Sequence, residues 1–344
     1  MQLAGETLGR TKRATIHDVA RHASVSIKTV SRVVNDVKTV DAAMADRVRT
    51  AVTELNYRPN FLASTLKSGA RTSTVGFIGK RGALEVAGAV REGAETIAFR
   101  HAAQLIAATT TESASSAADV ALARDLIRRR VDGLLLMPSG GNFSPLEVER
   151  RSRFPIVVLD REAHGLEADS VVIDNESGAR EAVARLIADG HERIAMLLSS
   201  LQIATMNARM RGAKNAIRDA GLLLSQSPTL VGVMDSPSAG DAISHLLDTT
   251  NPPTAVFCGN SELTVGVIRE VLRRQFPLAV AGFDVFGLAD LMPVPLLLVE
   301  SSGYELGRAG AELLYQRLEN PDRPQQRVVL PARLREFRGA GAIT

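Results

Sequence analysis

The 344-residue chain is too long for one ordinary domain, and its length predicts two or three. Hydrophobic residues make up 45% of it, enough for substantial cores, and a single cysteine, Cys258, leaves no disulfide to form within the chain. No apolar leader follows Met1, and no apolar run reaches the roughly 18 residues of a membrane-spanning helix. These features argue against membrane and disulfide-stabilised secreted proteins, and we expect a cytoplasmic one.

Basic residues are concentrated near the N-terminus. Residues 1–72 contain 12 Lys and Arg against 6 Asp and Glu, whereas the rest of the chain contains 29 against 32. A basic module on a mildly acidic body is typical of a protein whose N-terminal part meets the phosphate backbone of DNA. The alternative is an ordinary solvated basic face, which the motif described next makes the weaker interpretation. The polar residues 1–14 are predicted to form a disordered tail.

Three short helices are predicted in a domain of residues 15–58. Thr15 is a good N-cap for the first helix, Ser26 for the second and Asp41 for the third. The third helix ends before Pro59, because the residue before a proline is disfavoured in a helix. The apolar residues that recur at helical spacing are Ile16, Val19, Ala20 and Ala23, then Val30, Val33 and Val34, then Met44, Val48, Ala51 and Leu55.

The first two helices, joined by a turn of three to four residues, form a helix-turn-helix motif. In this motif the second helix enters the major groove of DNA and presents its first residues to the base edges. Lys28 and Arg32 are the candidates for hydrogen bonds to bases, and Ile27 for contact with a thymine methyl group. The residues expected to hold phosphates are Thr15, Ser26, Thr29, Ser31, Asn35 and Asn60.

The same region resembles the DNA-binding headpiece of the lactose-repressor (LacI/GalR) family. The resemblance is ordered and nearly ungapped, and it lies in residues 14–20 (ATIHDVA), 25–35 (VSIKTVSRVVN) and 55–63 (LNYRPNFLA). It implies a homodimer that binds a pseudo-palindromic DNA operator and responds to a small-molecule effector. Since the sequence ends at Thr344 without an apolar heptad tail, we expect a dimer rather than a tail-assembled tetramer.

Residues 59–73 are predicted to form a hinge helix and a linker. A helix as short as residues 60–66 is marginal in water, so we expect it to fold on DNA. The resemblance implies that this helix pairs with its dimer mate in the minor groove, with Ala63 in the DNA-binding segment and Leu66 as the apolar wedge between base steps. The alternative for Leu66 is a linker leucine that packs on the body of the protein.

From residue 74 on, short apolar strands alternate with amphipathic helices in two successive sets. This pattern predicts an α/β core of two lobes, each a doubly wound parallel sheet, behind an all-α headpiece. The core resembles periplasmic sugar-binding proteins, which implies an N-terminal lobe of residues 74–170 and 301–327 and a C-terminal lobe of residues 171–300 and 328–344. Ligands of such sheets bind at the carboxyl ends of the strands, so two facing lobes form a cleft.

The effector-binding positions of the family correspond here to Asp160, Arg161, Arg209, Asn260 and Asp284. Each residue follows a predicted strand or opens a helix, where side chains can converge on a ligand. Asn and Asp suit hydroxyl groups, and arginine offers a rigid fork to hydroxyl pairs or oxyanions. The alternative for each is a capping or turn residue, which the residues alone would favour for Asn260 and Asp284.

Several features of the family are missing from this cleft. Lys80-Arg81 stands in place of the usual Pro-Asp, and residues 84–87 (LEVA) replace an Asn-Pro-Phe-Phe sequence. The aromatic platform on which a sugar ring would stack is therefore absent there. Ser261, Val285 and Ser301 replace an Asp, a second Asp and a Gln.

The basic residues of the cleft point to a different ligand from an ordinary neutral pyranose. Lys80, Arg81, Arg161 and Arg209 could all lie near it. We therefore hypothesise an anionic effector, such as a sugar phosphate or a sugar acid. Loss of the response to small molecules is the rival hypothesis.

The sequence predicts a DNA-binding transcription regulator, specifically a repressor, and not an enzyme. It contains no Walker-type phosphate loop, no G-x-S-x-G elbow and no zinc-binding helix motif, so we expect no catalytic residue, metal site or cofactor. The alternative class is a stand-alone ligand-binding protein related to sugar-transport receptors, which the headpiece and the missing signal peptide disfavour. When bound to DNA the cytoplasmic protein would be associated with the nucleoid.

Overall fold

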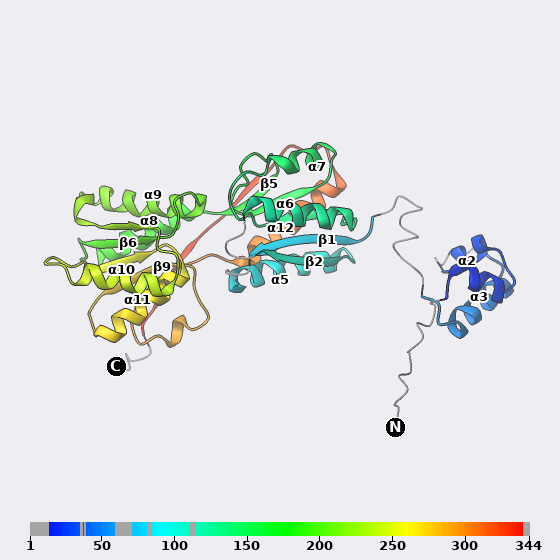
Figure 1. Cartoon of the computed structure of the whole chain (residues 1–344), viewed down its shortest axis with the longest axis horizontal. Helices are drawn as coiled ribbons and strands as arrows, with labels where there is room; N and C mark the ends of the chain where they lie inside the picture. Colours follow the sequence, from blue (N-terminus) through cyan, green and yellow to red (C-terminus); the bar gives the residue numbers. More distant parts are fainter. Residues whose placement is uncertain are drawn as a thin grey trace, which may run out of the picture. The chain divides into compact units, whose positions relative to one another are not determined.

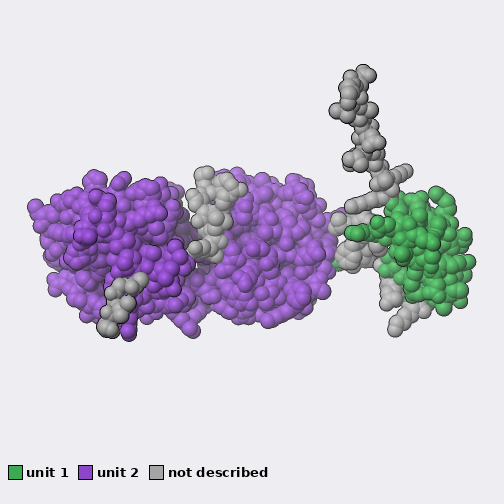
Figure 2. All heavy atoms as spheres, turned by 90° about the horizontal axis from the view of Figure 1, so that it is seen from below, with its two compact units in different colours: residues 1–71 green, residues 72–344 purple. Residues whose placement is uncertain are grey.

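The computed structural model describes residues 14–34, 37, 39–58, 71–80, 84–110 and 115–339 of the chain. The chain divides into two compact units, residues 1–71 and residues 72–344 (Figure 2). Several predictions fall outside the described residues: the tail of residues 1–13, the hinge helix of residues 60–66, and the site residues Asn35, Asn60, Ala63, Leu66 and Arg81.

The first unit contains the three predicted helices, α1 (Ile16–His22), α2 (Ile27–Val34) and α3 (Ala42–Glu54). Thr15 forms a capping box with Asp18 at the start of α1. Ser26 accepts a hydrogen bond from the Thr29 backbone N–H at 3.1 Å, and Asp41 accepts from two backbone N–H groups of α3. Each of the three predicted caps therefore satisfies backbone donors that a helix start leaves unpaired.

Val19, Val30 and Val48 form the centre of the first unit, with no exposed surface. The prediction that Met44 is buried is wrong, because its exposed fraction is 43% and the buried residue is its neighbour Ala45. The inner face of α3 contains Ala45, Val48 and Ala51, with Val52 and Leu55 partly buried beside them, so Met44 lies one position off it.

The second unit contains two six-stranded sheets. The first sheet has the order β2-β1-β3-β4-β5-β11, and every neighbouring pair is parallel. Val75 and Phe77 pack toward one face of it, under α5 and α12, while Ile78 packs toward the other, under α6. Its elements are β1 (Thr74–Lys80), α5 (Leu84–Arg100), β2 (Gln104–Thr110), α6 (Ser116–Arg128), β3 (Gly133–Leu136), α7 (Glu147–Arg151), β4 (Ile156–Asp160), β5 (Asp169–Ile173), α12 (Gly303–Glu319) and β11 (Arg327–Leu330).

The second sheet has the order β7-β6-β8-β9-β10-β12, in which only β12 runs antiparallel to its neighbour. Helices α8 and α9 cover one face and α10 and α11 the other (Figure 1). Its elements are α8 (Asn175–Ala188), β6 (Ile194–Leu198), α9 (Ala204–Asp219), β7 (Thr229–Val231), α10 (Ser236–Leu247), β8 (Ala255–Cys258), α11 (Ser261–Arg274), β9 (Ala279–Phe283), β10 (Leu296–Glu300) and β12 (Arg333–Phe337). The predicted fold of a helix-turn-helix domain and a two-sheet α/β core is confirmed.

Three connections join the two sheets: residue 174 after β5, residues 301–302 after β10, and residues 331–332 between β11 and β12. The crossings predicted near residues 171 and 328 lie about three residues too early. Strand β5 pairs with both β4 and β11, so residues 171–173 and 328–330 belong to the first sheet. No helix among the described residues combines the length and apolar character needed to cross a membrane.

Pairs of helices pack at glycines in both halves of the second unit. A Cβ atom at Gly307 on α12 would overlap the backbone carbonyl of Val90 on α5. Gly212 on α9 meets α8 at Glu176 in the same way, and Gly266 on α11 meets α10 at Ser236. Because the obstacle at each position is backbone, a side chain there cannot be accommodated by a change of rotamer.

We expect Gly307→Ala to lower the free energy of unfolding of the second unit by roughly 3 kcal/mol, since α5 and α12 must separate. Urea denaturation measures the change. The control is Gly88→Ala on α5, where no heavy atom lies within 4 Å of the new Cβ. That substitution should stabilise by about 0.5–1 kcal/mol, because alanine loses less backbone entropy than glycine. Equal effects of the two substitutions would contradict the close helix contact.

Candidate functional site

The described residues predicted to bind an effector come together around one cavity of 180 Å³ in the second unit. They lie at the carboxyl ends of strands of both sheets and at the first turns of α9, which is where parallel sheets place ligands. These residues are Lys80 at the end of β1, Asp160 at the end of β4, Arg161 after it, Arg209 on α9, Asn260 after β8 and Asp284 after β9. The apolar part of the lining includes Val86, Met137, Ile173, Ile203, Met206 and Leu306.

Two aspartates occupy equivalent positions in the two sheets. Asp160 ends β4 and Asp284 follows β9. Strand β4 is the fourth strand of its sheet counted from β2, and β9 is the fourth strand of its sheet counted from β7. Both residues have left-handed backbone conformations, with φ of 72° for Asp160 and 70° for Asp284. Such conformations are uncommon for a residue with a side chain and store some strain, which structures also use at ligand sites. Their repetition at the same place in each sheet supports a common role at the cavity.

Arg209 is the most buried charge of this cavity, with an exposed fraction of 5%. Its Nε donates to Asn175 Oδ1 at 2.7 Å, and its Nη1 donates to the Gly259 carbonyl at 2.7 Å and to Asp284 Oδ2 at 3.3 Å. The guanidinium carbon lies 3.6 Å from the centre of the Phe283 ring, a cation–π contact. A buried cation needs this set of partners, because its desolvation would otherwise be prohibitive.

The other basic residues of the cavity also have partners. Arg161 donates to Asp160 Oδ2 from Nε at 3.0 Å and from Nη2 at 2.8 Å, and both side chains are less than one-fifth exposed. Lys80 Nζ donates to the Ser139 carbonyl at 3.2 Å. The anionic-effector hypothesis rested on four basic side chains near the cleft, and two of them, Arg161 and Arg209, are ion-paired within the protein. Arg81 lies outside the described residues, and the hypothesis stays a prediction.

Asn260 is a helix cap, as the alternative interpretation held, and it lines the cavity as well. Its Oδ1 accepts from the Leu263 backbone N–H at 2.9 Å at the start of α11. Its amide nitrogen has no hydrogen-bond partner among the described residues and can donate to a ligand. Two residues before it, the Cys258 thiol is fully buried, and burial raises its pKa to about 12.

The sequence analysis missed two polar residues that the structure brings into this network. Asn175 holds Arg209 and donates from its own amide to the Ile173 carbonyl at 3.0 Å. Ser301, noted only as a replacement, donates to Asp284 Oδ1 at 3.1 Å. Both follow the last residue of a strand by one or two positions, the same signal that identified Asp160 and Asp284.

The candidate DNA-binding residues of the first unit lie on the exposed side of α2 and around its start. Lys28 and Arg32 are exposed, and Ile27 has an exposed fraction of 40% although it is apolar. Ser26 and Thr29 share a hydrogen bond of 2.8 Å between their hydroxyls, and Ser31 is half-buried. Thr15 donates to Asp18 at 2.7 Å. The first turns of α2 therefore present one apolar side chain and two cations.

Two family models match the chain: "Bacterial regulatory proteins, lacI family" over residues 15–60 and "Periplasmic binding protein-like domain" over residues 183–336. The HTH-type transcriptional repressor PurR of Vibrio atlanticus (strain LGP32) is 31% identical over 314 residues, which are 90% of this chain and 93% of that protein. The ribose operon repressor of Escherichia coli (strain K12) is 31% identical over 94% of this chain and 98% of its own.

Solved structures share the fold. The Lac repressor dimer bound to operator and the anti-inducer ONPF aligns with a TM-score of 0.81 at 24% identity, over 94% of this chain and 98% of that one. A complex of the transcriptional regulator CelR with cellobiose aligns with a TM-score of 0.68 at 27% identity and the same coverage.

We expect Arg209→Leu to lower the free energy of unfolding of the second unit by about 3–5 kcal/mol, because Asp284 and Asn175 lose their buried partner. Chemical denaturation measures the change. The control is Arg211→Ala on the same helix, whose pair with Glu176 at 3.0 Å is about half-exposed. It should change stability by at most about 1 kcal/mol. A cost for Arg209→Leu as small as that of the control would show that the network contributes no stability.

Proposed function

The chain belongs to the LacI family of bacterial regulatory proteins, and on that basis we propose that it is a repressor whose DNA binding is controlled by a small molecule. It binds a pseudo-palindromic operator as a dimer. The observation that carries the proposal is that one chain combines an exposed helix-turn-helix face with a cavity lined by paired charges at the strand ends of both sheets. The alternative, a stand-alone ligand-binding protein, leaves the headpiece without a role.

On the DNA side, α2 is the helix that enters the major groove. Arg32 and Lys28 supply donors to the acceptor-rich edges of bases, and the exposed Ile27 at the start of α2 is an apolar contact for a thymine methyl group. Thr15 and Ser26 lie at helix starts and Thr29 and Ser31 on α2, and their hydroxyls set the register on the phosphate backbone. The assignments of Asn35, Asn60, Ala63 and Leu66 remain predictions from the family resemblance.

On the ligand side, the cavity favours a neutral ring that carries hydroxyl groups. Asp160 and Asp284 retain acceptor capacity beside their arginines, and Asn260 offers an amide donor. Hydroxyl groups can both donate to the carboxylates and accept from the amide, whereas an oxyanion would face two carboxylates directly. The named sugars of two relatives, ribose in the operon repressor and cellobiose in the CelR complex, agree with this chemistry.

The hydrogen bonds of the cavity suggest how ligand binding in the cavity changes the DNA affinity of the first unit. Arg209 binds Asn175 next to the first crossing between the sheets, and Asp284 binds Ser301 at the second crossing. A ligand that competes for Asp284 therefore acts on two of the three connections about which the lobes reorient. Its binding energy couples to operator affinity through that reorientation, and the coupling is reciprocal.

The dimer has a candidate surface at the edges of the two sheets. Apolar side chains are exposed on or beside the outer strands β2 and β7, and a second copy of the chain would cover them. They are Phe99 (84% exposed), Ile106, Val231 and Met234.

We expect Arg32→Ala to weaken binding to the preferred operator by about 1–3 kcal/mol and to relax the preference at one base pair of each half-site. The operator is first selected from random duplex DNA with the purified dimer. Affinities for the operator and its single-base variants are then compared at one salt concentration.

The control for this experiment is Arg49→Ala on α3, whose side chain pairs with Asp46 at 2.8 Å. It should leave the base preferences unchanged. An equal loss on all DNA sequences would show that Arg32 only contacts phosphate. Failure of the intact protein to enrich any sequence would refute the proposed DNA binding.

A thermal-shift screen tests the proposed ligand class. We expect neutral sugars to raise the melting temperature, because they bind the native state alone, and Asp284→Asn to reduce the shift. A shift with sugar phosphates or sugar acids alone would support the anionic hypothesis and contradict the neutral one. The absence of a shift with all three classes would contradict control by a sugar-like molecule.

A further inference from the structure

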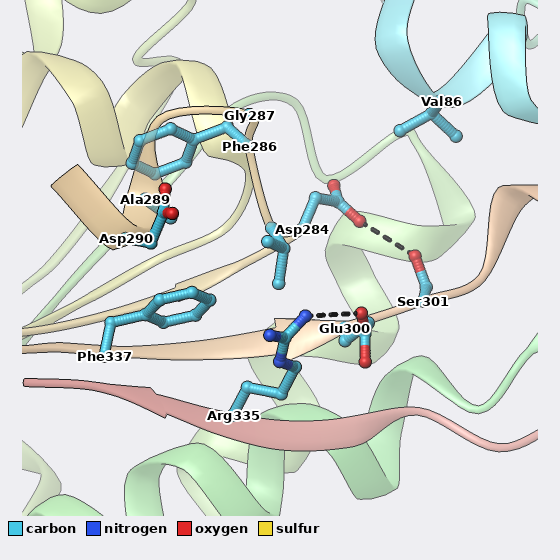
Figure 3. A pocket seen from close by; sticks show the side chains of 11 residues that line it. Val86, Asp284, Phe286, Gly287, Ala289, Asp290, Glu300, Ser301, Arg335 and Phe337 are labelled. Carbon is cyan, nitrogen blue, oxygen red and sulfur yellow. Dashed lines mark hydrogen bonds and ion pairs between the residues drawn. The ribbon is translucent and has the colours of Figure 1, made fainter.

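A second cavity, of 390 Å³, opens directly beside the central one. The two cavities share Val86, Asp284 and Ser301 in their linings, so these residues border both. Figure 3 shows these three residues on one side of the second cavity, with the hydrogen bond between Asp284 and Ser301 at the boundary. A ligand bound to Asp284 in the central cavity therefore lies next to the second cavity.

The far side of this cavity is aromatic. Phe286 and Phe337 are each packed in part against the core of the second sheet and half-buried, so each ring keeps surface toward the cavity. In Figure 3 the two rings lie on the same side, opposite Val86, with the Asp290 carboxylate in between. Ring faces of this kind bind flat apolar surfaces, either another aromatic ring or the C–H face of a sugar.

The charges of the second cavity are also internally compensated. Arg335 donates to Glu300 at 2.9 Å, and its guanidinium carbon lies 5.1 Å from the centre of the Phe337 ring. This pair lies between the aromatic side and the shared boundary (Figure 3). It offers both a donor and an acceptor, and together with the exposed Asp290 it gives a polar rim to an aromatic floor.

The sizes of the two cavities support their use as one site. The central cavity, at 180 Å³, is smaller than the roughly 300–1,000 Å³ of ordinary small-molecule sites. With the second cavity of 390 Å³, the site falls within that range. Residues 84–87, where the family has an aromatic platform, contain no aromatic residue in this chain. Phe286 and Phe337 supply aromatic surface from the other lobe.

We propose that the effector of this protein has two linked rings: a hydroxylated ring held by Asp160, Asp284 and Asn260, and a second ring that stacks on Phe286 and Phe337. The ligand class is a glycoside whose second ring is a sugar or an aromatic group. This inference rests on the proposed function of the central cavity, and it adds the second cavity as the part of the site that selects a two-ring ligand.

Calorimetric titration of the full-length protein tests the inference with three sugars, D-glucose, D-galactose and D-ribose, each free and as its 4-nitrophenyl α- and β-glycosides. We expect at least one glycoside to bind about tenfold more tightly than the corresponding sugar. Phe286→Leu and Phe337→Leu should remove this gain and leave the affinity for the free sugar unchanged. Asp284→Asn should weaken the sugar and its glycoside alike.

A fluorescence experiment locates the second ring without relying on a loss of binding. The chain contains no tryptophan, so Phe337→Trp places a single tryptophan at the second cavity. We expect the nitrophenyl group of a bound glycoside to quench its fluorescence strongly. The matched control, Leu223→Trp, places the only tryptophan on an exposed position after α9 that lines neither cavity, where a bound glycoside should quench far less.

Equal affinities of sugars and glycosides would overturn the two-ring inference, and so would a gain that persists in both leucine variants or quenching that is equal in the two tryptophan variants. Failure of every glycoside to bind would overturn it too. These outcomes are separate from failure of the proposed function. Free sugars that bind through Asp284 would preserve the central site, and operator selection with Arg32→Ala tests DNA binding independently.

Discussion

The buried guanidinium of Arg209 is the constraint on which the ligand cavity depends. A cation with an exposed fraction of 5% can remain in the fold only if its donors find acceptors and its charge finds a counter-ion. Its partners come from three separate places along the chain: Asn175 at the start of α8, Gly259 after β8 and Asp284 after β9. By holding these three segments to one side chain, Arg209 sets the shape of the cavity before any ligand binds.

The same constraint links ligand binding to lobe movement. Asp284 is shared between Arg209, which lies in one lobe, and Ser301, which lies in the connection to the other. Its left-handed backbone holds the carboxylate at that position at a cost in strain, and Asp160 repeats the arrangement beside Arg161. A ligand hydroxyl that donates to either carboxylate changes the balance of an existing ion pair. In this way a neutral molecule can shift the lobes without bringing a charge of its own.

The sequence predicts the parts of the structure that local chemistry decides. Thr15, Ser26 and Asp41 cap helices because a helix start needs acceptors wherever it lies. The prediction for Met44 is wrong because Met44 and Ala45 both lie at helical spacing from Val48, and tertiary packing buries Ala45, while Val48 and Ala51 are buried as predicted. Likewise the sequence of residues 171–173 predicts an apolar strand but does not tell which lobe it belongs to. Only its pairing with β4 and β11 assigns it to the first sheet.

Prediction of the site was limited in the same way, because charge pairing depends on tertiary packing. The family resemblance identified Asp160, Arg161, Asn260 and Asp284, but it could not show which charges neutralise one another. The choice of partner depends on side chains far apart in the sequence, such as Arg209 and Asp284, which are 75 positions apart.

The aromatic side of the cleft could not be predicted from the sequence for the same reason. Residues 84–87, where the family has its aromatic platform, contain no aromatic residue. Phe337 lies more than 50 positions beyond Phe286, and the two meet at one cavity because the antiparallel strand β12 returns the chain to β10. The proposed two-ring site therefore takes its aromatic surface from the other lobe, through a strand pairing that local sequence does not reveal.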